Sequence, residues 1–386
     1  MNQLSLRRSF ASVPLAIATV LILATNVLAA PPTWTSATTL RNSNDVSLGD
    51  ADFSNQNVAV AWDEPDSPRQ VGIRTSVDAG SGFGPISWFG GSRQPAVDVC
   101  GGAELNAVMA HKFGPGNWFI EHAQGSIDGV DFLTTPVAPS DGIQKHPDVT
   151  CAGGRLFVSW LEEESTGDRL FVSHGRRTGG GFSSPIDLGF DSETFFGHSL
   201  AVAGVSNMAY AAYARTGGDL RLMRWGIGNA PNYPVTPLGE VILDDATRND
   251  PAIQTVIAAA GDKVAVAWTR CDAVYARVSN DRGQTWGPIR ELIGHAACGG
   301  DFFASPMSIA VNGQRIAVAY NAAGIVGNGE VGLIRTTNNF VNFTDDEISS
   351  GFQAEHLVGY LNVSGQTRLG AAFQPDESRV RFRRQQ

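Results

Sequence analysis

Carboxylates, arginines, histidines and a tyrosine recur in this chain next to short runs of small and aliphatic residues. Ten of them are candidates for one ligand site: Asp63, Glu64, Arg93, His146, Asp148, Glu162, Arg215, Asp250, Arg270 and Tyr320. Paired carboxylates could serve as general acid and base on a glycosidic bond, and clustered arginines could hold an anion through paired hydrogen bonds. Their spacing matches no complete catalytic set, so the catalytic residues stay unassigned.

Seven short segments position these side chains, and each segment ends a small-residue run on a ring. The rings are Trp62, His111, Trp160, Tyr213, Trp268, Tyr320 and Phe373, and they are 49, 49, 53, 55, 52 and 53 residues apart. Repetition at this period in a β-type sequence predicts the blades of a propeller. We expect the small residues where neighbouring blades press together, and the rings as packing groups between strands.

The repeat from Asp250 to Leu292 shows the strands expected within one blade. Its β-compatible runs are Ala252 to Ala259, Val264 to Trp268, Val274 to Val278 and Ile289 to Leu292. Four antiparallel strands of this kind make one propeller blade. Loops between second and third strands then share a face with the links between blades, so we expect the ten candidates to gather at a central funnel on that face.

The two chain ends indicate how the ring closes. The last repeat stops after its third run, Val380 to Arg383, while Trp34 and the run Thr35 to Leu40 match Trp286 and the run that follows it. The N-terminal run therefore supplies the missing strand and removes an exposed sheet edge. We predict an all-β, seven-bladed propeller of four-stranded antiparallel blades, closed by the N-terminal strand completing the last blade.

Residues 1–29 have the features of a secretory signal peptide. Arg7 and Arg8 precede an apolar stretch from Val13 to Leu28, and small residues lead up to Ala29. Such a segment is removed on export, so we expect a single propeller domain over residues 30–386 and a secreted or periplasmic protein. The arginine pair leaves a twin-arginine route open.

Composition narrows the classes of partner. The formal net charge is −10 at pH 7, and an acidic surface repels phosphate backbones, so no nucleic acid is expected as a partner. No later apolar run reaches the ~20 residues that span a bilayer, so no membrane insertion is expected. We expect a monomer.

Four cysteines in an exported protein are expected to form two disulfides. Cys100 and Cys151 occupy matching places in neighbouring repeats, and Cys271 and Cys298 flank one repeat boundary. The connectivity stays open, because sequence alone does not fix it. A metal site would need closer spacing and nearby histidines, so neither a metal nor another cofactor is predicted.

One turn carries a recognisable motif. Ser279-Asn280-Asp281-Arg282-Gly283-Gln284-Thr285-Trp286 has the S-x-D-x-G-x-T-W pattern of the Asp-box, or BNR repeat, and its structural residues are Ser279, Asp281, Gly283, Thr285 and Trp286. Weaker copies follow the third run of other repeats, at Ser76, Ser126 and Thr337. In these features the chain resembles the sialidase-like β-propeller superfamily.

The resemblance implies a ligand site on the face opposite the Asp-box turns. A sialidase needs an arginine cluster, a tyrosine nucleophile with a glutamate, and an aspartate acid, and its first arginine lies in an F/Y-R-I-P sequence that this chain lacks. We therefore expect an exported module that binds a glycan or protein through its funnel rather than an enzyme. The alternative is a sialidase-like exo-glycosidase.

Overall fold

The computed structural model describes residues 33–43, 45–65, 68–114, 116–128, 131–140, 142–177, 180–190, 200–215, 217–245, 254–270, 273–294, 302–324, 330–350, 356–376 and 378–386. All of them lie within one compact unit, Pro31–Gln386. The expected signal peptide, Asp250, Cys271 and Cys298 lie outside the described residues. The elements in these ranges are all strands, and no described helix is long and apolar enough to cross a membrane.

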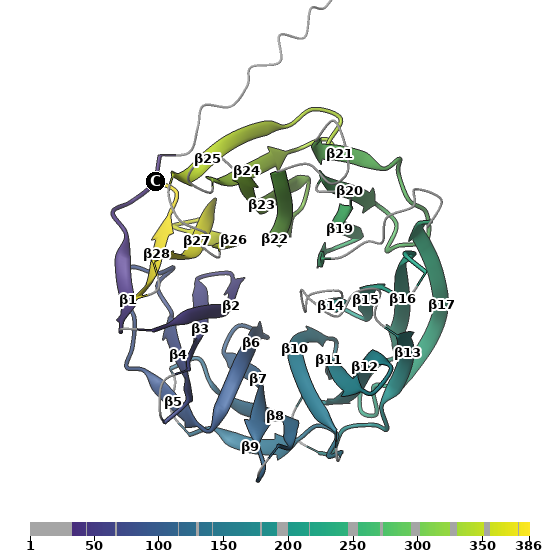
Figure 1. Cartoon of the computed structure of the whole chain (residues 1–386). Coiled ribbons are helices and arrows are strands. Elements are labelled where there is room, and N and C mark those ends of the chain that lie inside the picture. Colours follow the sequence, from purple (N-terminus) through teal and green to yellow (C-terminus); the bar gives the residue numbers. More distant parts are fainter. Residues whose placement is uncertain are drawn as a thin grey trace, which may run out of the picture. The chain divides into compact units, whose positions relative to one another are not determined.

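Five sheets have four antiparallel strands each, arranged side by side (Figure 1). One contains β2 (Ser47–Ser54), β3 (Asn57–Glu64), β4 (Gln70–Ser76) and β5 (Ser87–Gly90). The next contains β14 (Leu200–Val205), β15 (Met208–Ala214), β16 (Leu220–Ile227) and β17 (Val235–Asp244). Another contains β18 (Thr255–Ala260), β19 (Lys263–Arg270), β20 (Ala273–Ser279) and β21 (Arg290–Ile293). The fourth contains β22 (Phe302–Asn312), β23 (Arg315–Gly324), β24 (Glu330–Thr336) and β25 (Thr344–Ser350).

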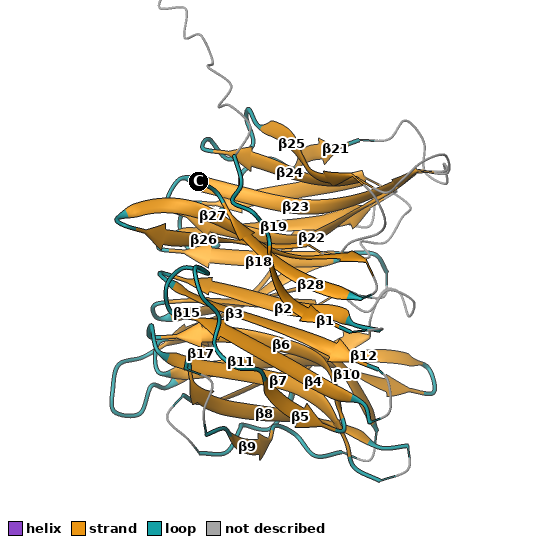
Figure 2. Cartoon of the chain, turned by 90° about the vertical axis from the view of Figure 1, so that its left-hand side faces the viewer, coloured by secondary structure: helices purple, strands orange, loops and turns teal. Residues whose placement is uncertain are grey.

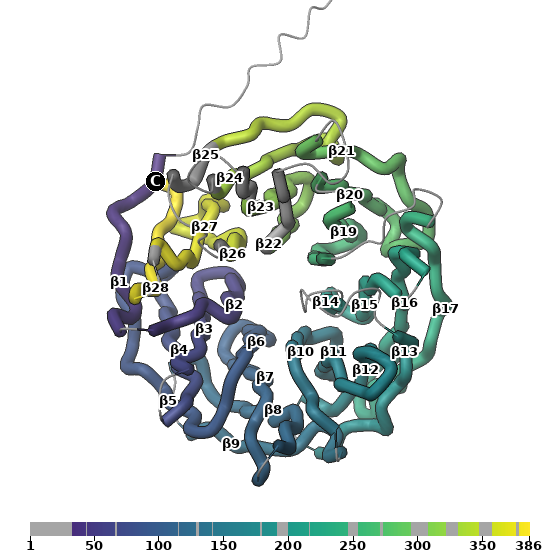
Figure 3. Tube along the Cα trace, in the orientation of Figure 1, coloured from purple at the N-terminus to yellow at the C-terminus, as the bar shows by residue number. Residues whose placement is uncertain are grey.

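The chain ends share the fifth four-stranded sheet, in the order β1-β28-β27-β26. Its strands are β1 (Thr38–Asn42), β26 (His356–Val363), β27 (Gln366–Asp376) and β28 (Arg379–Arg384). Thr38 pairs with Phe382 across β1 and β28, and Trp34 forms a bridge with Gln385. The expected pairing of the N-terminal strand with the last repeat is therefore present, and it leaves β1 on the outer side of β28 (Figure 3).

The prediction of seven four-stranded blades is wrong. Only five sheets have four strands, because the second and third repeats form one eight-stranded sheet. Its strands are β6 (Ser92–Cys100), β7 (Glu104–Lys112), β8 (Trp118–Ser126), β9 (Leu133–Pro136), β10 (Ile143–Ala152), β11 (Arg155–Glu164), β12 (Gly167–Arg176) and β13 (Ile186–Phe190). A parallel pairing between Ile143 and Trp118 joins β10 to β8. The repeat pattern could not show this link, because it reports similarity within repeats and not pairing between them.

The first strand of every repeat lies innermost, and these strands contact one another in a closed cycle. In order they are β2, β6, β10, β14, β18, β22 and β26, and β26 contacts β2 again. They surround a common axis in Figure 1, whereas the side view in Figure 2 shows the connecting loops gathered at the two opposite ends. The innermost strands therefore end near one another at each face.

The second strands form the core, and their small residues explain the close approach of neighbouring sheets. β3 and β15 are buried along their whole length, and the alanines of β19 are fully buried as well. Alanine leaves room for the facing strands, whereas the ring at the strand's end fills the wider space. Among the recurrent rings, only His111 is partly exposed; Trp62, Trp160, Tyr213, Trp268, Tyr320 and Phe373 are buried.

Two of these rings lie across a glycine of the adjacent third strand. Trp62 pairs with Gly72, and Tyr320 pairs with Gly332. A Cβ atom added to Gly72 would lie 2.5 Å from Cε2 of Trp62. The glycine is therefore required by the ring that packs over it.

We expect Gly72→Ala to lower the free energy of unfolding by about 1–3 kcal/mol, because overpacking forces the Trp62 ring off its position. Denaturant unfolding followed by tryptophan fluorescence measures this. Gly90→Ala is the matched control, because a Cβ there meets no atom within 4 Å. Equal stability of the two variants would contradict the packing role.

One disulfide, Cys100–Cys151, joins the innermost strands β6 and β10 of the eight-stranded sheet. Their Cα atoms are 5.9 Å apart and 51 residues apart in sequence. A cross-link of this kind limits the freedom of the unfolded chain. It thus reinforces the contact between two repeats whose innermost strands also line the central cavity.

Candidate ligand site at the mouth of the central cavity

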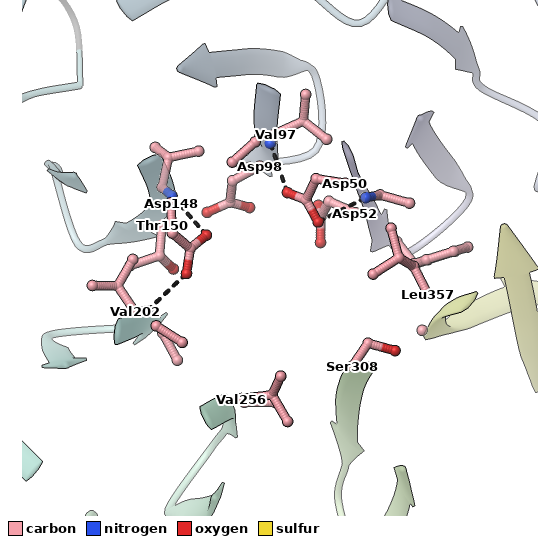
Figure 4. Close-up of a pocket in the computed structure, with 18 of the residues that line it drawn as sticks. Asp50, Asp52, Val97, Asp98, Asp148, Thr150, Val202, Val256, Ser308 and Leu357 are labelled. Atoms are coloured by element: carbon pink, nitrogen blue, oxygen red, sulfur yellow. Dashed lines mark hydrogen bonds between the residues drawn. The ribbon is translucent and has the colours of Figure 1, made fainter. Parts of the chain in front are cut away.

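A cavity of about 900 Å³ runs between the innermost strands. Residues from β2, β6, β10, β14, β18, β22 and β26 line it, so it follows the axis of the ring. Figure 4 shows that its two sides differ: Asp50, Asp52, Asp98 and Asp148 lie on one side, and Val256, Ser308 and Leu357 lie on the other. The cavity therefore has an acidic wall and a largely uncharged wall.

Each acidic side chain accepts a backbone N–H from the next innermost strand. Val97 N–H donates to Asp50 Oδ2 at 2.7 Å, and Val99 N–H donates to Asp52 Oδ2 at 2.9 Å. The same kind of hydrogen bond joins the next two pairs of strands. Between β6 and β10, Cys151 N–H donates to Asp98 at 2.5 Å, and between β10 and β14, Val202 N–H donates to Asp148 at 2.8 Å. The carboxyl groups thus replace the sheet hydrogen bonds that the innermost strands do not make with one another.

Burial raises the pKa of all four carboxyl groups. The pKa of Asp50 rises to about 8, chiefly by desolvation and then through the charge of Asp148. Desolvation raises the pKa of Asp148 to about 6. Desolvation also raises the pKa of Asp52. Desolvation and the charge of Asp52 together raise the pKa of Asp98 well above its ordinary value. The carboxyl group of Asp50 is therefore largely protonated at pH 7.

At one end of the cavity, two innermost strands bend at matching places. β6 and β10 each carry an irregularity in pairing, before Ala96 and before Asp148. Gln94 and His146 lie at these bends with φ of 50° and 48°, and a proline follows each of them. Residues other than glycine rarely adopt such φ values, and bulges often turn side chains toward functional sites.

Gln94 and His146 contact each other across the two strands. The backbone N–H of His146 donates to Gln94 Oε1 at 3.2 Å, and Gln94 Nε2 lies 3.3 Å from Nε2 of His146. Both residues line the cavity. Together they form a polar rim between the acidic wall and the outer face.

Asp63 and Arg69 extend this rim toward the sheet of β2 to β5. Arg69 donates to Asp63 Oδ2 at 3.0 Å, and the backbone N–H of Gln94 approaches the same oxygen at 3.4 Å. Asp63 is only 7% exposed, yet its Oδ1 has no hydrogen-bond partner, and neither has Nε of Arg69. Buried polar atoms without partners are uncommon, so this pair is an unusual feature of the rim.

Arg93 and Trp118 complete the cluster. The guanidinium carbon of Arg93 lies 3.9 Å from the centroid of the Trp118 ring, and that of Arg69 lies 5.9 Å from it. Burial lowers the pKa of Arg93, and the charge of Arg69 adds to this effect. Its buried Nε has no hydrogen-bond partner. Two guanidinium groups therefore share one aromatic face beside the cavity mouth.

An exposed aromatic side chain stands on the same hairpin. Phe113 follows β7, is 71% exposed, and packs edge-on against Phe119 with ring centroids 6.0 Å apart. Its backbone N–H closes the hairpin by donating to Asn117 O. We define the mouth cluster as Asp63, Arg69, Arg93, Gln94, Phe113, Trp118 and His146.

The structure brings some of the predicted candidates together and separates others. Asp63, Arg93 and His146 belong to the mouth cluster, and Asp148 lies deeper on the acidic wall. Glu64 is buried and forms an ion pair with Arg41. Glu162 accepts from Gln144 Nε2 at 3.0 Å. These two glutamates therefore serve contacts within the fold.

The other candidates lie away from the cavity lining. Arg270 is 1% exposed and donates from Nε to Asp244 Oδ2 at 2.8 Å. The Tyr320 hydroxyl donates to Asp345, and Arg215 follows β15. None of these three lines the cavity, so they do not gather with Asp63 and His146 at its mouth.

Sequence reasoning did not single out Gln94, Trp118 and Asp98. A signal for Gln94 does exist, because Arg93-Gln94-Pro95 and Lys145-His146-Pro147 are matching basic-polar-proline triplets at the start of innermost strands. No comparable signal marks Trp118. Its importance arises from two arginines on other strands and loops.

The Asp-box turn has the expected internal hydrogen bonds. Ser279 Oγ accepts from the N–H of Gly283 at 2.8 Å, Thr285 N–H donates to Asp281 at 2.8 Å, and Trp286 Nε1 donates to Gly283 O. Hydrogen bonds from the Thr285 hydroxyl, the Thr285 N–H and the Ser279 hydroxyl lower the pKa of Asp281 to about 2. The turn is a self-contained structural element.

One group of metal-ligating atom types occurs among the described residues. A carboxylate oxygen of Asp98 and the sulfur atoms of Cys100 and Cys151 lie within 4.8 Å of one another. Both sulfurs are held in the disulfide, so neither is a thiolate that could ligate a metal. This group does not form a metal site.

The arrangement of sheets around a common axis is that of a β-propeller. Solved structures with a similar fold include a Trypanosoma rangeli sialidase in complex with the inhibitor DANA, at 13% identity over 78% of this chain, with a TM-score of 0.43. A Streptococcus pneumoniae sialidase (11% identity, 92% of this chain and 70% of the other, TM-score 0.44) and the phage phi92 endosialidase (9%, 92% and 69%, TM-score 0.50) are similar as well. The chain spans about half, 56%, of the Trypanosoma protein. No protein-family model and no curated protein matches the chain.

Proposed function

We propose that this protein is an exported glycan-binding propeller that holds an acidic oligosaccharide at the mouth cluster. The observation that carries the proposal is Arg93, whose guanidinium lies on Trp118 beside that of Arg69. A guanidinium on an aromatic ring is well placed to pair with a carboxylate. The exposed face of Phe113 could pack against a sugar ring.

The neighbouring polar groups fit the hydroxyls of a sugar. Asp63, Gln94 and His146 line the cavity and present donors and acceptors at its rim. A small set of polar groups held in fixed positions sets the orientation of a ligand. The disulfide and the predicted signal peptide support a role outside the reducing cytosol.

Binding is favoured over catalysis because no tyrosine joins this cluster. Tyr213 is fully buried and its hydroxyl donates to Glu240, which also pairs with Arg221; Tyr320 is 7% exposed and donates to Asp345. Neither hydroxyl is open to a sugar. The tyrosine–glutamate contact therefore belongs to the packing of the sheet.

A glycan array probed with the secreted protein tests the proposal, together with a panel of aryl-glycosides that includes a sialoside. We expect retention of carboxylated oligosaccharides on the array and no release of the aryl group. Aryl release that disappears in Arg93→Gln would establish the hydrolase instead. Failure to retain any acidic glycan would overturn the binding proposal.

A further inference from the structure

The acidic wall of the cavity has a consequence beyond ligand binding. Asp50, Asp52, Asp98 and Asp148 lie on the same side of one cavity, and each bonds to the backbone of the next innermost strand. Any change in their charge therefore acts directly on the contacts that hold β2, β6, β10 and β14 around the axis.

Among the described lining residues, no cationic side chain lies opposite these carboxyl groups. Ser308 and the side chains of Val256 and Leu357 form the facing wall in Figure 4. The described residues of β14, β18 and β22 add no titratable group to the lining, and β26 adds only Tyr360. Arg69, Asp63 and His146 stand at the mouth, where Arg69 is already paired with Asp63.

The geometry points to a proton-dependent clasp: the four aspartates hold one side of the ring together most strongly while part of them carry protons, and their full ionisation loosens it. A shared proton removes the repulsion between neighbouring carboxyl groups and leaves an oxygen free to accept each backbone N–H. When all four ionise, four negative charges face one poorly solvated space.

The direction of the pH effect follows from the raised pKa values. A carboxyl group whose pKa is higher in the folded than in the unfolded protein stabilises the fold at low pH, and that stabilisation is lost as the pH rises through the folded value. For Asp148 and Asp50 these folded values are about 6 and about 8. The loss attributable to Asp50 therefore begins near its unfolded pKa of about 4 and is complete just above its folded value of about 8, so its last part falls between about pH 7 and pH 9.

Histidine titration changes the stability of the fold with pH in the opposite direction. Its contribution must therefore be separated from that of the carboxyl groups. Burial lowers the pKa of His122 to about 4, and burial also lowers the pKa of His174. These residues gain protons on unfolding below the ordinary histidine value of about 6.5, so they make stability rise with pH there. Above about pH 7 both are neutral in either state, and the carboxyl groups dominate.

Thermal unfolding measured at pH values from 7 to 9 tests the clasp. EDTA is present so that no divalent cation replaces the protons. We expect the Tm of the wild type to fall by about 2 °C over this range. In Asp50→Asn the fall should be at most about half as large, because asparagine keeps an acceptor for Val97 N–H and carries no charge. Asp128→Asn, at an exposed position, should retain the wild-type fall.

Infrared spectroscopy of the wild type tests the same inference without relying on a variant. The stretch of a protonated carboxyl group should be visible at pH 7 and absent at pH 9.5, and Asp50→Asn and Asp148→Asn should each weaken it. A flat Tm profile in the wild type, or no protonated carboxyl band at pH 7, would overturn the clasp. Neither result would bear on glycan binding at the mouth cluster.

Discussion

Arg93→Gln weakens binding of an acidic oligosaccharide at least about tenfold, because hydrogen bonds to a charged group contribute about 1.5–3 kcal/mol. The substitution keeps part of the side chain on Trp118 but removes the positive charge. Isothermal titration calorimetry with a carboxylated glycan identified on the array measures the change. The effect should appear in affinity and not in Tm, since Arg93 forms no ion pair with a carboxylate among the described residues.

The matched control for this variant is Arg169→Gln. Arg169 also lies over an aromatic ring, Phe190, at 4.7 Å, but it pairs with Glu164 and Asp187 and is not part of the mouth cluster. Its affinity for the glycan should equal that of the wild type. If both variants bind as tightly as the wild type, Arg93 is not a ligand residue and the placement of the anion is wrong.

Arg270→Ala lowers the free energy of unfolding by about 3–5 kcal/mol, because it leaves a buried carboxylate without its cation. Arg270 and Asp244 have side chains 1% and 3% exposed, and Trp268 Nε1 donates to the same Asp244 oxygen at 3.1 Å. Chemical denaturation of the purified variant measures the loss. Glycan affinity of the folded fraction should be unchanged, which separates this arginine from Arg93.

An exposed ion pair provides the comparison for Arg270. Arg282 pairs with Asp262 at 2.6 Å, and their side chains are 45% and 63% exposed. Arg282→Ala should cost less than about 1 kcal/mol, since water solvates both charges once the pair is broken. Similar losses in the two variants would show that burial does not govern the contribution of these pairs.

The repeat pattern predicted the strands well because it reflects local physical requirements. Runs such as VAVAW at Val58 need small side chains where sheets meet and a ring where space opens, and both requirements can be read from the sequence. The pairing of β1 with β28 was predictable for a related reason: an incomplete last repeat needs a strand. The single pairing of Ile143 with Trp118 left no sequence pattern, and the number of separate blades was therefore mispredicted.

The site was predictable in location but not in composition. Topology alone places Asp63, Arg93 and His146 at the same face, because they stand at the ends of first and second strands. Whether a charged residue is free or already paired depends on partners far away in sequence. Arg270 is satisfied by Asp244, 26 residues earlier, whereas Arg93 depends on Trp118 for its only aromatic contact.

The location of the ligand is the central claim, and hydroxyl-radical footprinting with and without the bound glycan tests it most directly. Mass spectrometry of the oxidised side chains compares the two faces of the ring. We predict that the glycan reduces oxidation of Phe113 and Trp118 and leaves Trp286, in the Asp-box turn, unchanged. Protection of Trp286 with no protection of Phe113 or Trp118 would contradict the proposed site.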